Sequence, residues 1–172
     1  MGVLYRVRQF ALALGAQANG ERVEDLSQFL GGHKQELFCR MPSMDQHHCL
    51  AVFGTLREAG HTDPSLLEAA LLHDVGKTLG PVRIGHRVLA VLGKALFPAL
   101  WNTLDGQPCT WRYPFSVHRR HAALGAELAE EAGCTSDVVW LVAHHEDERR
   151  DVEPGDHMGS LLAALQVADQ SN

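Results

Sequence analysis

The sequence predicts an all-α protein. Leucine and alanine are abundant, aromatic residues make up only 6% of the 172 residues, and this composition favours helices. Apolar residues recur at i, i+3 and i+4 along most of the chain, which is the period of an amphipathic helix, and runs of β-branched residues are nearly absent. A chain of this length buries a core without disulfides, so we expect one compact domain overall.

Turn and capping signals mark the boundaries of the expected helices. We expect residues 1–42 to form N-terminal helices that pack on the core, and residues 43–172 to form the main domain. Ser43 is expected to cap one helix, with Gln46 completing a capping box, and the pair Asp63–Pro64 opens the next helix. The expected helices cover residues 3–17, 23–30, 34–41, 43–60, 66–80, 83–101, 116–133, 136–145 and 158–169.

Charge and cysteine usage exclude several classes of protein. The net charge of −6 argues against general nucleic-acid binding, which requires a basic face. The four cysteines are scattered and form no CxxC pair, so a reducing cytoplasm is the expected location. No apolar run reaches the length needed to cross a bilayer, and we expect no membrane association. A homo-oligomer is compatible with the sequence.

Metal-capable side chains occupy helical positions where core residues belong. In residues 66–80, the apolar stripe leads to Asp74, with His73 beside it; a buried carboxylate is costly unless it is paired or bound to metal. The same exception recurs on other helices at His48, His121, His145 and Asp169, and His144 adjoins His145. Any one of these residues alone is more often a buried core residue whose polar atoms are paired within the protein. Their recurrence on five helices predicts that they converge on a metal centre.

The ligand types narrow the choice of metal. Mixed imidazole and carboxylate ligands suit Mn, Fe, Co, Ni or Zn, whereas Mg is less favoured because it prefers oxygen ligands. One or two ions are compatible with the residues. Cationic side chains near the centre, Lys77 and Arg83, are candidates to bind phosphate together with His118. For Lys77 and Arg83, the equally weighted alternative is that each is a solvent-exposed residue at a helix end with no role in phosphate binding.

These residues resemble the HD-domain superfamily of metal-dependent phosphohydrolases, whose defining pattern is H…HD…D. The pattern is matched by His48, by His73-Asp74 in LLHDVGK and by Asp169 in LQVADQ, and the resemblance spans residues 43–170. It implies an HD-domain-like helical bundle in which these four residues bind a first metal ion.

A partial likeness extends to two-metal members of the superfamily, including the HD-GYP cyclic-dinucleotide phosphodiesterases. Their H-x-x-x-G and HHE elements look like His121…Gly125 and His144-His145-Glu146, which implies a second ion bound by His121, His144 and His145. The GYP tripeptide is absent, and the glutamate often found four residues before the first histidine is replaced by Met44. Hydrolysis of cyclic di-GMP is therefore not expected.

The resemblance implies hydrolysis of a phosphate ester in a nucleotide or other small phosphorylated molecule. Asp74 is the candidate to orient the attacking water while binding metal, and Lys77, with Arg83 or His118, would neutralise the phosphoryl oxygens. Two alternatives stay open: an HD-type di-iron oxygenase, and a non-catalytic regulatory module that binds metal or nucleotide. We expect the His48 site to fill before the His121 site.

Overall fold

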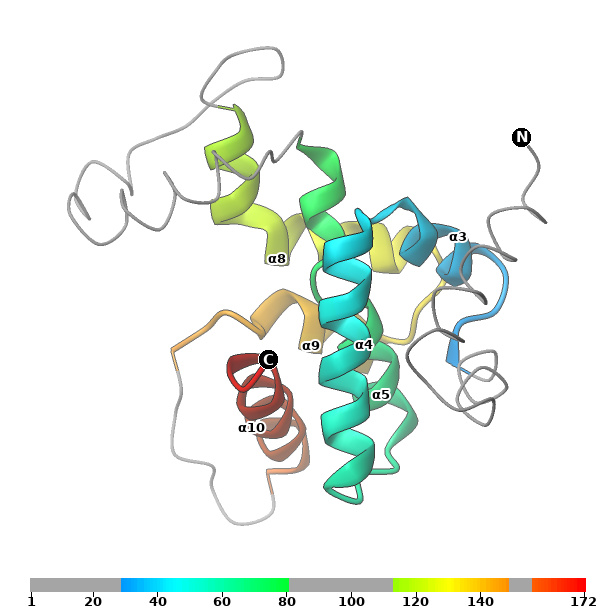
Figure 1. Ribbon diagram of the computed structural model, residues 1–172, viewed down its shortest axis with the longest axis vertical. Coiled ribbons are helices and arrows are strands. Elements are labelled where there is room, and N and C mark those ends of the chain that lie inside the picture. Colours follow the sequence, from blue (N-terminus) through cyan, green and yellow to red (C-terminus); the bar gives the residue numbers. More distant parts are fainter. Residues whose placement is uncertain (1–28, 81–112, 149–155) are drawn as a thin grey trace.

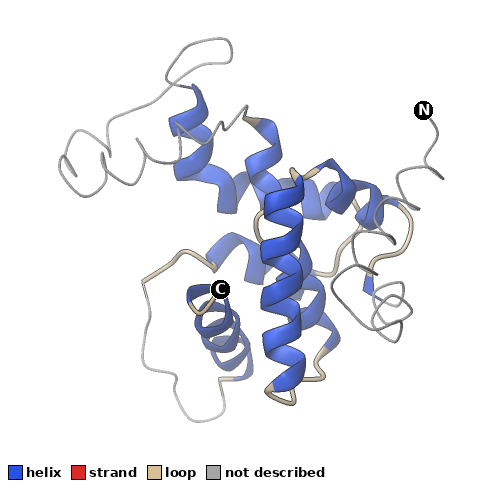
Figure 2. Ribbon diagram, in the orientation of Figure 1, coloured by secondary structure: helices blue, strands red, loops and turns tan. Residues whose placement is uncertain are grey.

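The structure is a computed structural model and describes residues 29–80, 113–148 and 156–172. Within these ranges every regular element is helical and no strand occurs (Figure 2). The prediction of an all-α fold is confirmed for this part of the chain. The helices expected over 3–17 and 83–101, residues 23–28 of the helix expected over 23–30, and Arg83 lie outside the described residues.

The described part of the chain consists of a series of helices. In chain order they are α3 (His33–Arg40), α4 (Ser43–Glu58), α5 (Pro64–Leu72), the 3-10 helix η1 (Val75–Leu79), α8 (Tyr113–Glu131), α9 (Ser136–His144) and α10 (His157–Gln170). None of these helices is long and apolar enough to span a membrane.

Helix α5 is the central element of the bundle. It packs against α3, α4, α9 and α10, and all of its residues from Leu66 to Leu72 are buried. All of these residues except Glu68 are apolar, and a helix that is apolar on nearly every side belongs inside a protein. In Figure 1, α5 lies behind α4, with α9 and α10 to one side. The chain that leaves the C-terminal end of α5 is therefore still in the interior, and it carries the His-Asp pair.

The start of α5 follows its sequence signals. The Asp63 carboxylate accepts a hydrogen bond from the backbone N–H of Leu66 at 3.0 Å, and Pro64 occupies the first turn. Both features satisfy or remove N–H groups that have no partner within the helix. The Asp63–Pro64 signal is confirmed.

The end of α5 differs from the expectation of one helix over residues 66–80. The α-helix ends at Leu72, and Asp74 has φ −95° and ψ 2°, outside helical geometry, before η1 begins at Val75. Gly76 weakens the helix locally, and η1 approaches α8 closely there. The continuous helix is therefore a wrong expectation: Asp74 points inward from a turn, and not from a helical stripe.

The capping box expected at the start of α4 is also wrong. Pro42 occupies the N-cap position, where its ring has no side-chain acceptor for the helix N–H groups, and Ser43 lies within the first turn. The Gln46 amide instead donates to the backbone carbonyl of Met41 at 2.8 Å. Gln46 thus ties the start of α4 to the chain that precedes it.

Helix α3 lies in the described portion of the N-terminal part. It contacts α5, α8 and η1, and Lys34 Nζ lies 2.7 Å from Glu68 Oε1 on α5. This helix therefore packs on the core. The division of the chain at residue 42 stays a prediction.

Candidate metal centre

The centre of the bundle gathers metal-capable side chains from five helical segments. These are His48 from α4, His73 and Asp74 from the turn after α5, His121 from α8, His145 at the end of α9 and Asp169 from α10. Two groups of three place their ligand atoms within 4.8 Å of one another: the His48 triad, made of His48, His73 and Asp74, and the His121 triad, made of Asp74, His121 and His145. Asp74 belongs to both.

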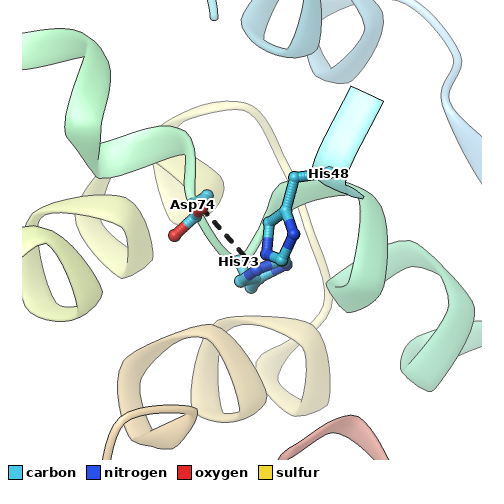
Figure 3. Close-up of side chains that lie close together, drawn as sticks. All are labelled: His48, His73 and Asp74. Atoms are coloured by element: carbon cyan, nitrogen blue, oxygen red, sulfur yellow. Dashed lines mark ion pairs between the residues drawn. The ribbon is translucent and has the colours of Figure 1, made fainter. Parts of the chain in front are cut away.

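In the His48 triad, two rings and a carboxylate face one another (Figure 3). His73 Nε2 lies 3.8 Å from Asp74 Oδ2 and 3.5 Å from Asp169 Oδ1. Asp169 Oδ1 also lies 2.8 Å from His48 Nε2. Asp169 therefore borders this triad and adds a second carboxylate to it.

The His121 triad uses the other oxygen of Asp74. His121 Nε2 lies 3.4 Å from Asp74 Oδ1 and 3.2 Å from His145 Nε2, and all three residues are buried. The two oxygens of one carboxylate thus face two different groups of imidazoles. This is the arrangement in which a carboxylate can bridge a pair of ions.

Backbone hydrogen bonds fix the tautomers of the buried imidazoles. In each ring, Nδ1 forms a hydrogen bond with the backbone carbonyl three residues earlier. The distances are 3.0 Å from His73 to Ala70, 2.6 Å from His121 to His118 and 2.8 Å from His145 to Val142. A carbonyl only accepts, so Nδ1 carries the proton and the neutral ring presents a lone pair at Nε2.

Those lone pairs have no satisfactory partner within the protein. His73 Nε2 is buried without a hydrogen bond to any described residue, and the Nε2 atoms of His121 and His145 face each other at 3.2 Å. A buried acceptor without a donor is costly, and two lone pairs at this distance repel each other. A cation between these nitrogens and Asp74 removes both penalties, so the residues present fit a metal ion.

The electrostatics of the centre favour charged carboxylates and a neutral His145. Burial raises the pKa of Asp74, but His73, His121 and Lys77 outweigh it, and the pKa lies well below 3.8. The pKa of Asp169 is lowered in the same way, because its contacts with His48 and His73 outweigh burial. Burial, with like charge from His73 and His121, lowers the pKa of His145 to about 3.

His73 behaves differently because it lies between carboxylates. Burial lowers its pKa, but Cys49, Asp74 and Asp169 outweigh this effect and the pKa lies well above 6.5. The groups around His73 therefore favour positive charge at this position, as they would favour a bound cation.

Lys77 extends from η1 to the shared carboxylate. Its Nζ lies 2.6 Å from both oxygens of Asp74, while 18% of its side chain is exposed. The ammonium group thus lies at the boundary between the metal centre and solvent. A substrate entering from that boundary would meet it.

Other residues named from the sequence lie at the edge of the centre. His144 belongs to neither triad: it is half-buried, donates from Nδ1 to the Trp140 carbonyl at 2.7 Å, and stacks on that indole at 4.4 Å between ring centroids. The ring of His118 is stacked on His121 at 5.8 Å. Arg83 lies outside the described residues.

Two contacts of the centre were missed by sequence reasoning. The Cys49 thiol lies 3.8 Å from His73 Nδ1, and its burial raises its pKa. Gln166 is buried and hydrogen-bonded to the end of α9. Both residues are close in sequence to metal-capable residues: Cys49 follows His48 directly, and Gln166 lies one helical turn before Asp169. That proximity was the signal in the sequence that could have indicated their place beside the centre.

The bundle and its centre define a class of helical protein with clustered histidine and aspartate side chains that could hold a metal ion. A family model described as the HD domain matches residues 46–171, well over half of the chain. The chain therefore belongs to the HD domain family, whose members are generally metal-dependent hydrolases. No curated protein and no solved structure matches it. Membership of the family is confirmed, and the narrower likeness to HD-GYP members stays a prediction.

Proposed function

We propose that this protein is a metal-dependent phosphohydrolase that acts on a nucleotide or another small phosphorylated molecule. The observation that carries the proposal is the shared carboxylate of Asp74. One of its oxygens faces His73, the other faces His121, and Lys77 Nζ lies 2.6 Å from both oxygens. Ion binding and phosphate recognition thus meet at one side chain.

Two sets of residues would hold the ions. His48, His73, Asp74 and Asp169 form the first set, and Asp74, His121 and His145 form the second. The ligand types favour Mn, Fe, Co, Ni or Zn over Mg. His144 would join the second set only if its ring left the Trp140 carbonyl, so we assign it to the rim of the site.

A divalent ion bound there supplies Lewis acidity, which lowers the pKa of water and polarises a phosphoryl oxygen. Asp74 orients the attacking water by accepting its hydrogen bond. Lys77 donates to the phosphoryl oxygens as negative charge develops on them. His118, stacked on His121, and Arg83, near Lys77 in sequence, are proposed to contact the substrate phosphate.

The test begins with the metal content of the purified protein. A panel of phosphomonoesters and phosphodiesters, with nucleotides included, is then assayed with Mn, Fe, Co, Ni and Zn in turn. Turnover that depends on metal and is lost on chelation supports the proposal. Iron with an electron paramagnetic signal and oxygen consumption would instead identify an oxygenase. Bound metal without any turnover would identify a regulatory module.

Replacement of Lys77 by methionine is expected to lower kcat by about 10²–10³-fold, the range found when one donor to a developing anion is lost. The bound ions are expected to stay, because Lys77 contributes charge and no ligand atom. Lys34→Met is the matched control, because Lys34 also pairs with a poorly exposed carboxylate, that of Glu68. Equal kcat values for Lys77→Met and the wild type would exclude a catalytic role.

A metal titration is expected to resolve two steps. The His48 set carries two carboxylates, Asp74 and Asp169, whereas the His121 set carries only Asp74, so the first set attracts a divalent ion more strongly. Isothermal titration with Mn²⁺ measures both steps. Two ions bound with equal affinity would contradict the order.

His144 and His145 are expected to respond differently to replacement by alanine. His145 presents a buried Nε2 to the His121 triad, whereas the His144 ring packs on Trp140. His145→Ala should remove the weaker ion, and His144→Ala should retain it. Metal analysis after dialysis against a low metal concentration distinguishes the two variants. Loss of that ion in His144→Ala would place its ring among the ligands.

A further inference from the structure

Helix α10 carries a buried amide among its apolar residues. Gln166 is 5% exposed and follows Leu165, which is fully buried. Its Nε2 donates to two backbone carbonyls, those of His145 at 3.2 Å and Asp147 at 2.9 Å. A primary amide has two N–H donors, so both are used, and both are directed at one short segment of chain.

That segment is the end of α9. The last carbonyl groups of a helix have no partner within it, and here a side chain from another helix binds two carbonyls of the turn that follows. The turn is otherwise closed by the N–H of Asp147, which donates to the His144 carbonyl at 2.9 Å. His145 is the C-cap residue of α9, with φ −60° and ψ −25°. Its backbone is thus held from both sides.

The backbone of His145 determines where its ring lies. Nδ1 donates to the carbonyl of Val142, and Nε2 faces His121. A shift of the turn would carry the ring away from His121 and Asp74. Asp169, three residues after Gln166 on α10, borders the His48 triad. One helix therefore contacts both halves of the centre, with a carboxylate at one triad and an amide behind the other.

We infer that Gln166 is a positioning residue that holds His145 in the His121 triad and fixes the second ion site relative to Asp169. The inference rests on the proposed function, because it presupposes that the triads bind ions. A residue that only joins α9 to α10 would change the stability of the protein without selecting one ion. A positioning residue weakens the ion of the His121 triad and leaves the ion of the His48 triad in place.

Three variants of the full chain separate these roles. Gln166→Met keeps the length of the side chain and removes both donors. Gln166→Glu keeps its shape and supplies a second measurement if the methionine variant does not fold. Gln46→Met is the matched control, because Gln46 Nε2 also binds two backbone carbonyls near a helix end, those of Met41 at 2.8 Å and Cys39 at 3.5 Å.

Each protein is titrated with Co²⁺ by calorimetry, and the visible spectrum of the bound Co²⁺ is recorded. The wild type is expected to bind two ions. In Gln166→Met and Gln166→Glu the weaker ion should lose about 10- to 100-fold in affinity, the range for residues that orient metal ligands, and its spectrum should change. The tighter ion, and both ions of Gln46→Met, should match the wild type.

Three results overturn the inference while the proposed function stands. The first is wild-type affinity and spectrum for both ions in the Gln166 variants, and the second is an equal loss of both ions. The third is a weaker ion lost to the same extent in Gln46→Met, which would reduce Gln166 to a general packing role. A wild-type protein that binds no Co²⁺ would overturn the metal centre itself, and the role of Gln166 with it.

Discussion

Asp74→Ala is expected to remove both ions and to lower phosphohydrolase activity by more than about 10³-fold. Loss of one stabilising donor costs about 10²–10³ in rate. Asp74 contributes more than one interaction, because its oxygens face His73 and His121 and bind Lys77. The variant loses the ligand shared by the two triads and the group that orients the attacking water.

Metal analysis and activity assays on the same preparation check this outcome. His33→Ala is the control: His33 is an exposed residue at the start of α3, whose only charged contact is Glu36 at 3.7 Å, within the described residues. It should keep metal and activity. Asp74→Asn serves as a second variant if the alanine protein is unstable, since it retains the shape of the side chain. Full metal stoichiometry in both Asp74 variants would mean that the His-Asp pair is structural only.

Much of the fold follows from local patterns in the sequence. The apolar period predicts α4, α8, α9 and α10 because one face of each is buried, and Asp63–Pro64 predicts the start of α5 because cap and proline chemistry is local. The inward positions of His48, His121 and Asp169 follow from the same periodicity. Each is a polar residue on an apolar stripe, and the structure brings all three to one centre.

Features that depend on contacts between distant segments could not be predicted. The α-helix ends at Leu72, and the chain that follows packs against the backbone of α8 at Gly76. Gly76 is a local signal that weakens a helix, but the contact with α8 joins segments far apart in the sequence. The donation from Gln166 to the end of α9 joins positions 19 and 21 residues apart. His144 and His145 are adjacent in sequence, and only the geometry at the end of α9 shows which ring faces the triad.

The last expectation concerns the backbone contact that positions α8. A Cβ at Gly76 would overlap the carbonyl oxygen of His121 and would lie 2.6 Å from the backbone nitrogen of Gly125. Backbone atoms of a packed helix cannot rotate away as a side chain can, so η1 and α8 would have to separate. We expect Gly76→Ala to lower the free energy of unfolding by about 3 kcal/mol, at the upper end of the usual cost of overpacking.

The separation would also move His121, whose own carbonyl is the atom contacted, away from Asp74. Gly76→Ala should therefore lose the ion of the His121 triad even under conditions in which it is folded. Gly54→Ala on α4 is the matched control, because a Cβ there meets nothing within 4 Å, and it should stabilise the helix by roughly 0.5–1 kcal/mol. Denaturant unfolding and metal analysis measure both effects. If Gly76→Ala matched the wild type in both, the contact between η1 and α8 would be looser than the structure has it.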